Sequence, residues 1–315
     1  MRAPLLYMLV AWTALLGAPR GTGWVRLAHG SEGVEGLTQG WEGIELTHGR
    51  EGVQRPAGAG ALAAHDAEDD GALDWALRAH RELRAYWPYP VEPHREFYFT
   101  RAFYSSGRND LFRGFPSWSV DFPKADLQFV MGLKRLVNHL DAYDYENPIS
   151  LGDPELLRYP FLYAVEVGYM SLTEPEVLGL RRYLEHGGFL VVDDFWGSRE
   201  WANFEREMGR ILPGRPIVEI PRDHPIFHSF YDIDEIIQVP NVGQGRFGGV
   251  TYEQDGYEPY VRGIFDDEGR LMVAISWNSD LGDAWEWAED PFYPLRFSTY
   301  AFQVGVNLVV YAMSH

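Results

Sequence analysis

The chain has 315 residues and a mass of 36.0 kDa, with 46 acidic and 27 basic side chains and a net charge of −19. This charge disfavours nucleic-acid binding, which needs clustered cations to release counterions from phosphate, and it disfavours docking on an anionic membrane. The absence of cysteine excludes disulfides, thiolate catalysis and cysteine-ligated metal sites.

Residues 1–23 are typical of a secretory signal peptide. Arg2 supplies a positive charge, Leu5 to Leu16 form an apolar run, and the small residues Gly17 and Ala18 follow. The run is too short to cross a hydrocarbon core of about 30 Å as a helix. We therefore expect an exported protein, periplasmic or extracellular, with no transmembrane span after cleavage and with membrane association left open. The alternatives are an uncleaved anchor and a misassigned start codon.

Residues 24–70 are rich in glycine and predict a flexible tether. The pattern Gly-x-Glu-Gly, followed by Val or Ile, begins at Gly30, Gly40 and Gly49. Each copy offers too few apolar residues to offset the ordering entropy of its glycines, so a linker is favoured over a small repeat.

Residues 71–95 contain apolar side chains at helical spacing from Leu73 to Trp87, before Pro88. The spacing predicts a short amphipathic helix that packs on the main domain. Binding to a separate partner is the less favoured alternative.

Residues 96–315 predict one α/β domain. Thr173 and Glu176 form a capping box before a helix that stops at Gly187 and Gly188, and the buried strand 189–192 follows. A strand, a helix and a second apolar strand in succession indicate a βαβ unit in a parallel sheet. The other expected elements are strands at 96–104 and 161–167, a helix introduced by Asp121 and Pro123, a hairpin from 260–265 and 270–277, and a closing helix at 295–313.

Several familiar motifs are absent or out of context, so we expect no cofactor and no metal centre. Gly243-x-Gly245-x-x-Gly248 matches a dinucleotide fingerprint by letter, but no helical pattern follows it, which favours a mobile surface loop. His224 and His228 stand four apart with Pro225 between them, which opposes a shared helix and favours structural histidines in a turn. Neither lysine of the chain follows a glycine, so no Walker motif exists.

Asp193 and Asp194 follow the buried strand 189–192 and are the strongest local signal. Acids at the carboxyl end of a parallel strand face the edge where open α/β sheets bind ligands, and they can act as a base, bind a cation or hold a sugar hydroxyl. The alternative, slightly favoured on sequence alone, is that one of them caps the helix starting near Ser198 while the other is solvated.

The segment from Ser276 to Trp287 alternates aromatic and acidic residues and is the second signal. Carbohydrate sites combine ring faces for stacking with carboxylates for hydroxyls or acid–base work, although aromatic loops that only seal a core are commoner. The candidate site residues are Arg101, Tyr104, Asp121, Asp193, Asp194, Trp196, His224, Asp280, Trp285 and Glu286.

Seven stretches between Glu96 and His315 together resemble the bacterial domain of unknown function 4159. They are Phe99–Tyr104, Trp118–Asp126, Tyr159–Tyr163, Gly187–Asp194, His224–Phe227, Asn278–Trp287 and Gly305–Tyr311. The resemblance implies a three-layer α/β/α sandwich with a mostly parallel sheet, of the flavodoxin-like or class I glutamine amidotransferase-like kind. Catalytic relatives carry a cysteine in the turn that corresponds to 193–197 of this chain. Without it, release of ammonia from glutamine is excluded.

The residues and the resemblance leave two main hypotheses of function. The first is a non-catalytic module of the cell envelope that binds a small ligand, a carbohydrate for example, or an envelope protein. The second is a carbohydrate-active hydrolase with Asp193, Asp194 or Glu286 as acid or base and Trp196 or Trp285 as stacking surface. A purely structural domain is a third interpretation.

Overall fold

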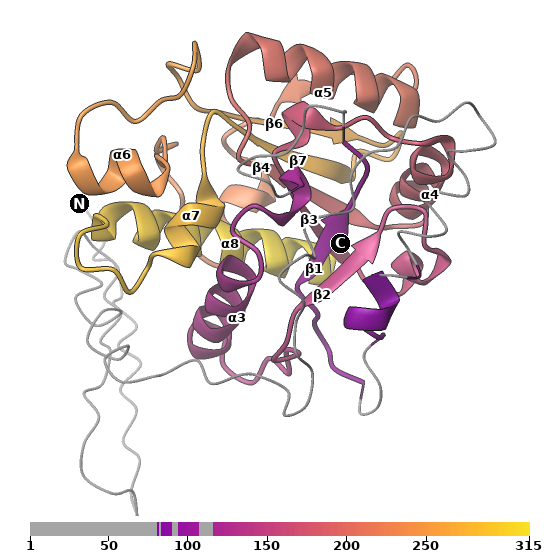
Figure 1. Cartoon of the computed structure of the whole chain (residues 1–315), viewed down its shortest axis with the longest axis horizontal. Helices are drawn as coiled ribbons and strands as arrows, with labels where there is room; N and C mark the ends of the chain where they lie inside the picture. Colours follow the sequence, from indigo (N-terminus) through magenta and orange to yellow (C-terminus); the bar gives the residue numbers. More distant parts are fainter. Residues whose placement is uncertain (1–80, 82, 90–93, 107–115) are drawn as a thin grey trace, which may run out of the picture. The chain divides into compact units, whose positions relative to one another are not determined.

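The computed structural model describes residues 81, 83–89, 94–106 and 116–315 (Figure 1). The expected signal peptide, the tether and the start of the expected amphipathic helix lie outside these residues. All described residues belong to one compact unit, Leu46–His315. Residues 83–86 are helical, and Leu83 is buried in the core of this unit.

A seven-stranded sheet forms the centre of the fold, in the order β2-β1-β3-β4-β7-β6-β5. The strands β2, β1, β3, β4 and β7 run parallel to one another, and β6 runs antiparallel to both β7 and β5. The bounds are β1 Thr100–Phe103, β2 Asn147–Ser150, β3 Phe161–Val165, β4 Phe189–Asp193, β5 Val218–Glu219, β6 Tyr260–Phe265 and β7 Leu271–Trp277. The expected α/β class with a mostly parallel sheet is confirmed.

Helices cover both faces of the sheet. One face carries α3 Lys124–Leu136, α7 Leu281–Glu286 and α8 Leu295–Ser314, and the other carries α4 Glu174–Glu185 and α5 Gly197–Ile211 (Figure 1). A further helix is α6 Val242–Phe247, and short 3-10 turns lie at η1 Ser117–Ser119, η2 Pro154–Arg158, η3 Val167–Tyr169 and η4 Pro225–Phe227. No helix in the described ranges is both long enough and apolar enough to cross a membrane.

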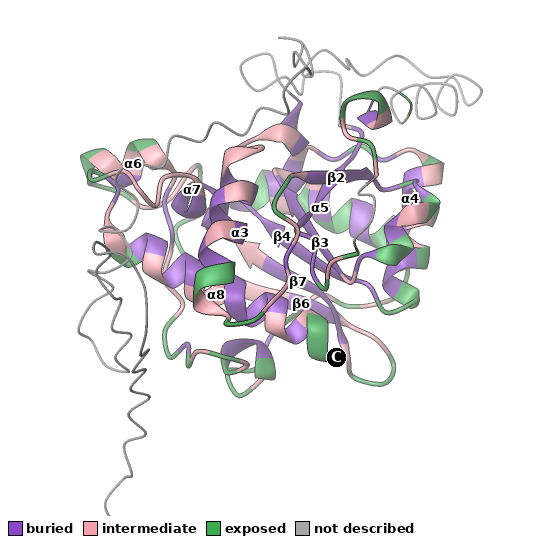
Figure 2. Cartoon of the chain, turned by 90° about the horizontal axis from the view of Figure 1, so that it is seen from below, coloured by how far each residue is buried: buried purple, intermediate pink, exposed green. Residues whose placement is uncertain are grey.

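The central strands alternate their side chains between two apolar layers. In β4, Leu190 and Val192 join the cluster under α4 and α5, whereas Phe189 contacts Tyr311 of α8. Every residue of β3 and β4 is buried, as a sheet covered on both faces requires (Figure 2). This alternation directs Asp193, the last residue of β4, to the same face as Phe189.

The expected βαβ unit is present in detail. Helix α4 begins with the capping box of Thr173 and Glu176, and the chain turns at Gly187, where φ is 99°. The expected hairpin is β6 and β7, and the expected closing helix is α8. The expected loop at 243–248 is wrong, because α6 forms there. Its start is capped by Asn241, whose side chain accepts a hydrogen bond from the Gln244 N–H at 2.9 Å.

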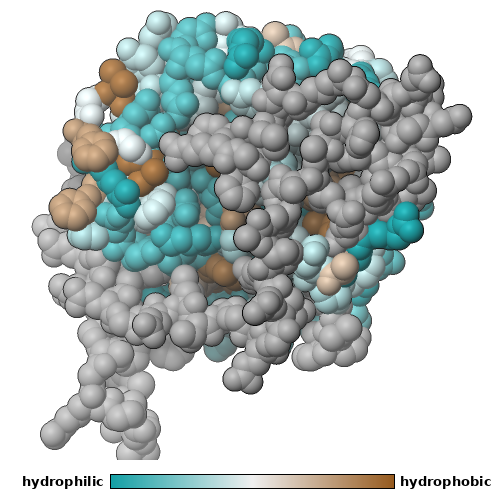
Figure 3. Space-filling view, in the orientation of Figure 1, coloured by the Kyte–Doolittle hydropathy of each residue, from teal (hydrophilic) through white to brown (hydrophobic). Residues whose placement is uncertain are grey.

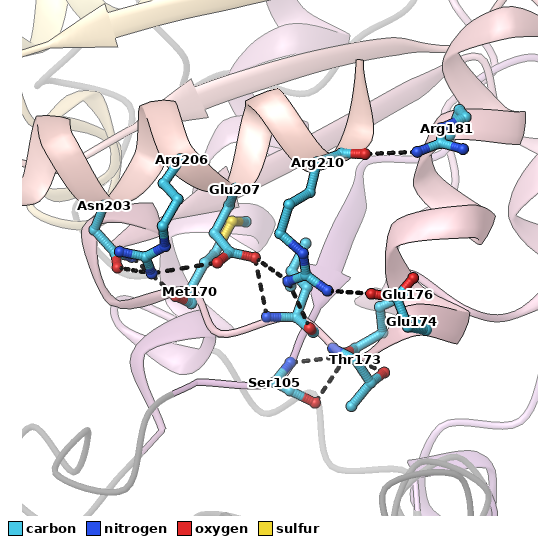
Figure 4. Close-up of polar contacts among 11 residues, drawn as sticks. Ser105, Met170, Thr173, Glu174, Glu176, Arg181, Asn203, Arg206, Glu207 and Arg210 are labelled. Carbon is cyan, nitrogen blue, oxygen red and sulfur yellow. Dashed lines mark hydrogen bonds and ion pairs between the residues drawn. The ribbon is translucent and has the colours of Figure 1, made fainter. Parts of the chain in front are cut away.

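A polar network holds the segments that follow β1 and β3 against α4 and α5 (Figure 4). The Glu176 carboxylate accepts hydrogen bonds from the backbone and hydroxyl of Ser105, at 2.8 and 3.0 Å, and from those of Thr173, both at 2.8 Å. On α5, Glu207 accepts a hydrogen bond from Arg210 at 2.7 Å and another from the Leu172 N–H at 3.3 Å. These contacts position the loops on the carboxyl side of the sheet.

Candidate functional site: an acidic cluster at the carboxyl edge of the sheet

Acidic side chains from three segments that are distant in sequence meet where β4 and β7 end. Asp193 and Asp194 close β4, the acids of α7 follow β7, and Asp121 precedes α3. We call Asp121, Asp194, Asp280, Asp283 and Glu286 the acidic cluster. Figure 1 shows α7 beside α3 on the side of the molecule that carries α6. The carboxyl ends of neighbouring parallel strands converge on one edge, which is why residues so far apart meet.

Asp193 is fully buried and ties β4 to α7. Its Oδ2 accepts hydrogen bonds from the Tyr163 hydroxyl at 2.7 Å and from the backbone N–H groups of Leu281 and Gly282 at 2.8 and 3.0 Å. Its Oδ1 is buried and has no hydrogen-bond partner among the described residues. Burial raises the pKa of Asp193 to about 7, although the hydrogen bonds to Oδ2 act in the opposite direction.

Asp194 lies in the turn between β4 and α5 with a φ of 48°. Its Oδ1 accepts a hydrogen bond from the Trp196 indole at 2.9 Å. Both aspartates are buried and neither caps α5, because the first N–H groups of that helix, those of Gly197 and Ser198, donate to Asn278 and Asp255 instead, both at 2.9 Å. The sequence-based alternative of one capping and one solvated aspartate is therefore wrong.

Three acids lie on or beside α7. Asp280 precedes the helix and its Oδ1 accepts a hydrogen bond from the Asp283 N–H at 2.7 Å. Asp283 accepts from the Val242 N–H and from the Trp287 indole. Asp280 and Asp283 are buried, whereas Glu286 is partly exposed and gives the cluster contact with solvent. These hydrogen-bond donors hold the carboxylates of Asp280 and Asp283 in fixed orientations.

Asp121 completes the cluster from the loop before α3. Its φ is 60°, its side chain is only partly covered, and its Oδ2 is buried with no hydrogen-bond partner in the described part of the chain. Ligand oxygens of two sets of three acids lie within 4.8 Å of one another, and Asp121 belongs to both sets. The Asp194 set contains Asp121, Asp194 and Asp280, and the Glu286 set contains Asp121, Asp283 and Glu286.

The cluster concentrates negative charge in a poorly solvated place. Burial is the largest cause of the raised pKa of every member, and repulsion from neighbouring carboxylates raises the pKa further at Asp121, Asp194 and Asp280. The pKa of Glu286 is raised to about 7. Two basic side chains near the cluster form ion pairs with acids outside it. Arg101 binds Asp126, and Lys124 binds Glu289.

Two further acids, Glu166 and Glu253, border the cluster and are not among the site residues expected from the sequence. Glu166 follows β3 with a φ of 53°, and repulsion from Asp194 and Glu200 adds to the burial that raises its pKa. Glu253 also has a raised pKa, caused by burial and by the charges of Glu200 and Asp283. The rule that singled out Asp194, an acid directly after a buried strand, applies equally to Glu166 after β3.

The structure separates several expected site residues from the cluster. His224 contacts Phe265 at the end of β6 and Tyr311 of α8, which places it at the opposite edge of the sheet. Its Nδ1 accepts a hydrogen bond from the Ile226 N–H, so it is a structural residue of a turn. The structure therefore places His224 apart from the acidic cluster.

Neither tryptophan proposed for stacking offers a free ring face. Trp285 is 1% exposed and its ring packs among Phe99, Phe129 and Tyr163. Trp196 is buried as well, and its contact with the cluster is the indole hydrogen bond to Asp194. The expectation that these two rings stack against a ligand is wrong, because both rings are buried.

Arg101 and Tyr104 support the site from β1 and the residue after it. The buried guanidinium of Arg101 lies over the Tyr163 ring, 4.8 Å from its centroid, and pairs with Asp126 through Nε at 3.1 Å. The Tyr104 hydroxyl donates to the backbone oxygens of Val165 and Glu166, at 2.7 and 3.0 Å. Both residues therefore position strands β1 and β3 beneath the cluster.

Exposed aromatic side chains lie on the segments next to the cluster. Phe247 of α6 is 90% exposed, and Tyr257 and Phe292 are also exposed. Figure 3 shows hydrophobic residues standing out among hydrophilic ones on the left side of the view, where α6 lies. Arg246 of α6 and Lys124 both lie over the Trp287 ring, with 4.3 and 3.9 Å to its centroid.

The fold and this site together define an α/β protein with a buried acidic cluster at the carboxyl edge of its sheet. All ligand atoms in the two sets are carboxylate oxygens, the donors that Mg²⁺, Ca²⁺ and Mn²⁺ prefer. The family model described as Domain of unknown function (DUF4159) matches residues 112–313, and the chain belongs to this family. A search of curated proteins finds no match.

Proposed function

We propose that this chain is a non-catalytic binding module of the cell envelope, and that its ligand site is the acidic cluster. The proposed ligand is a divalent cation. It binds either alone or together with a partner rich in oxygen atoms, such as a carbohydrate or an envelope protein. The observation that carries the proposal is the convergence of the Asp194 set and the Glu286 set, each with its three ligand oxygens within 4.8 Å.

The charge balance supports a cationic ligand. Ionised carboxylates at this separation repel one another, and burial strengthens that repulsion because water screens it poorly. Protonation, which the raised pKa values of Asp121, Asp194 and Asp280 favour, relieves this repulsion, and a bound cation relieves it with the carboxylates ionised. Carboxylates are hard oxygen donors, so Ca²⁺, Mg²⁺ and Mn²⁺ suit the cluster.

Thermal unfolding of the full chain, after treatment with a chelator, tests the proposal. A cation present at about one hundred times its dissociation constant should stabilise the protein by about 2.7 kcal/mol, which shifts the melting temperature by several degrees. Asp280→Asn should abolish or reduce the shift, and Glu268→Gln, which removes one charge from the exposed β6–β7 turn, should retain it. A melting temperature that no divalent cation raises would contradict the proposal.

We also propose that the fold is of the class I glutamine amidotransferase-like kind and that the protein is exported. Support for the fold comes from the turn between β4 and α5, where Asp194 has a φ of 48° at the place expected for a cysteine nucleophile in catalytic relatives. Support for export comes from the apolar run Leu5 to Leu16 behind Arg2. Fractionation of cells that produce the tagged chain tests export, and a solved structure compared with known folds tests the fold.

A carbohydrate-active hydrolase is the second candidate, favoured by one specific observation. Glu286 is partly exposed with a pKa raised to about 7, which suits a general acid, and the carboxyl groups of Asp121 and Asp283 lie beside it. The exposed rings of Phe247, Tyr257 and Phe292 replace the two buried tryptophans as candidates for stacking. Release of reducing ends from polysaccharides, lost in Glu286→Gln, would support this candidate over simple binding.

A further inference from the structure

Asp121 occupies a special place in the acidic cluster because it belongs to both ligand sets. The other four members divide into two pairs on different segments. Asp194 and Asp280 lie at the ends of β4 and β7, and Asp283 and Glu286 lie three residues apart on α7. Residues at this spacing lie on one face of a helix, so Asp283 and Glu286 can reach the same point.

Unpartnered oxygens provide a second line of evidence, independent of the clustering. The buried Oδ2 of Asp121 accepts no hydrogen bond from any described residue, although this part of the protein is closely packed. The Oδ1 of the fully buried Asp193 also lacks a partner among the described residues, although Asp193 belongs to neither ligand set. Buried polar atoms in native proteins nearly always have a partner, and an exception calls for a water or an ion.

The space around Asp121 Oδ2 is defined by Gly282. A Cβ at position 282 would lie 2.6 Å from this oxygen and 3.0 Å from the Tyr163 hydroxyl. The absence of a side chain at Gly282 therefore lets Asp121 approach the start of α7, where Asp193 is also bound.

We propose that the acidic cluster binds two divalent cations, with the Asp121 carboxylate shared between them. Asp194 and Asp280 complete one site, and Asp283 and Glu286 complete the other. This inference rests on the proposed function of the cluster as a cation site and adds the number of ions and the shared ligand. The ions are of the oxygen-preferring class, Mg²⁺, Mn²⁺ or Ca²⁺, because no histidine belongs to either described set and the chain has no cysteine.

Hydrogen-bond donors next to Asp194 and Asp283 hold these carboxylates in position for binding a metal ion. The Trp196 indole holds Asp194, and the Trp287 indole and the Val242 N–H hold Asp283. Donors that bind one oxygen of a metal-ligating carboxylate fix the direction of the other lone pairs, and such partners commonly strengthen metal binding by tenfold or more. The structure assigns Trp196 to this positioning role in place of stacking.

Mn²⁺ binding to the chelator-treated full chain tests the inference by two measurements. Equilibrium binding gives the number of ions, and electron paramagnetic resonance detects whether they share a ligand, because Mn²⁺ ions joined by a carboxylate couple magnetically. We expect two coupled ions in the wild-type chain. Asp280→Asn and Glu286→Gln should each leave one uncoupled ion, and Asp121→Asn should weaken both sites at least about tenfold.

The outcomes separate this inference from the proposed function. One ion in the wild-type chain, or two ions without coupling, would overturn the shared site and leave the cluster as a cation site. No bound ion would overturn both. If Asp121→Asn does not fold, the variants Asp280→Asn and Glu286→Gln still decide, because loss of both ions in either one would contradict two separable sites. Glu268→Gln should retain two coupled ions.

Discussion

Replacing Glu176 by glutamine should destabilise the protein far more than the same replacement at Glu174, two residues earlier on α4. Glu176 is 2% exposed and its two oxygens accept four hydrogen bonds, two from Ser105 and two from Thr173 (Figure 4). Glutamine keeps one acceptor oxygen, so its amide NH₂ would face either both Ser105 donors or both Thr173 donors. Two charge-assisted hydrogen bonds are lost, each worth about 1.5 to 3 kcal/mol.

The lower end of that range applies because the burial of charge is relieved at the same time. Burial raises the pKa of Glu176, which means that the neutral side chain is desolvated at a smaller cost than the ionised one. We therefore expect a loss of about 3 kcal/mol, and a melting temperature lower by about 6 to 12 °C. Urea unfolding followed by tryptophan fluorescence measures the difference.

Glu174→Gln is the matched control. The Glu174 side chain is 69% exposed and its contact is an ion pair with Arg210 at 2.6 Å, so its removal should cost less than about 1 kcal/mol. Equal losses in the two variants would refute the idea that a buried carboxylate holds the end of β1 against α4. Because Ser105 follows Tyr104, which bonds the Glu166 carbonyl, the same variant should also loosen the loops that border the acidic cluster.

Three further predictions concern Asp193, Asn307 and Gly282. In chelator, burial keeps a proton on folded Asp193 up to about pH 7, so Asp193 should lower stability by up to about 1.4 kcal/mol per pH unit as the pH rises from about 4 to 7. The raised pKa values of the cluster acids add to this slope, so Asp193→Asn should reduce the slope in urea titrations without abolishing it, and an unchanged slope would refute the contribution of Asp193. The Asn307 side chain makes four hydrogen bonds to the backbone of residues 226–231, so Asn307→Leu should cost about 4 kcal/mol in calorimetric melting, and a loss below about 1 kcal/mol would contradict the network. Gly282→Ala should displace Asp121 and weaken cation binding at least about tenfold in titration calorimetry, and unchanged affinity would show that Asp121 is not a ligand.

The βαβ unit was predictable because its signals are local. The capping box of Thr173 and Glu176, the two glycines after α4 and the apolar strand 189–192 each act over a few residues, and tertiary packing agrees with them. The placement of Asp194 near α7 was also predictable, since the carboxyl ends of parallel strands share one edge.

The composition of the cluster was less predictable, because it depends on contacts between distant segments. Asp121 and Glu166 adopt positive φ values that residues other than glycine rarely take, and the local sequence does not predict this backbone conformation. The ring of Trp285 belongs to the core, while Trp287, two residues later, is partly exposed. The alternation of aromatic and acidic residues in the sequence does not predict which of these two rings is buried by packing.

Buried acids outside the cluster that have a structural role are bound by hydrogen-bond donors. Asp126 pairs with the buried guanidinium of Arg101, Glu176 accepts four hydrogen bonds, and Glu207 binds Arg210 and the Leu172 N–H. Each of these carboxylates is saturated by donors from its surroundings, as buried charges usually are.

The acidic cluster does not follow that pattern. Its members lie against one another, the buried Oδ2 of Asp121 lacks a partner among the described residues, and the guanidinium that could neutralise it is bound to Asp126. A purely structural role would be served better by apolar side chains of similar volume, because uncompensated buried charge lowers stability. Glu176 is bound by four donors, whereas the cluster brings five carboxyl groups together and leaves the Oδ2 of Asp121 without a donor among the described residues. The combination of close carboxyl groups and an unpartnered oxygen is our reason to assign positive charge at this place to a ligand.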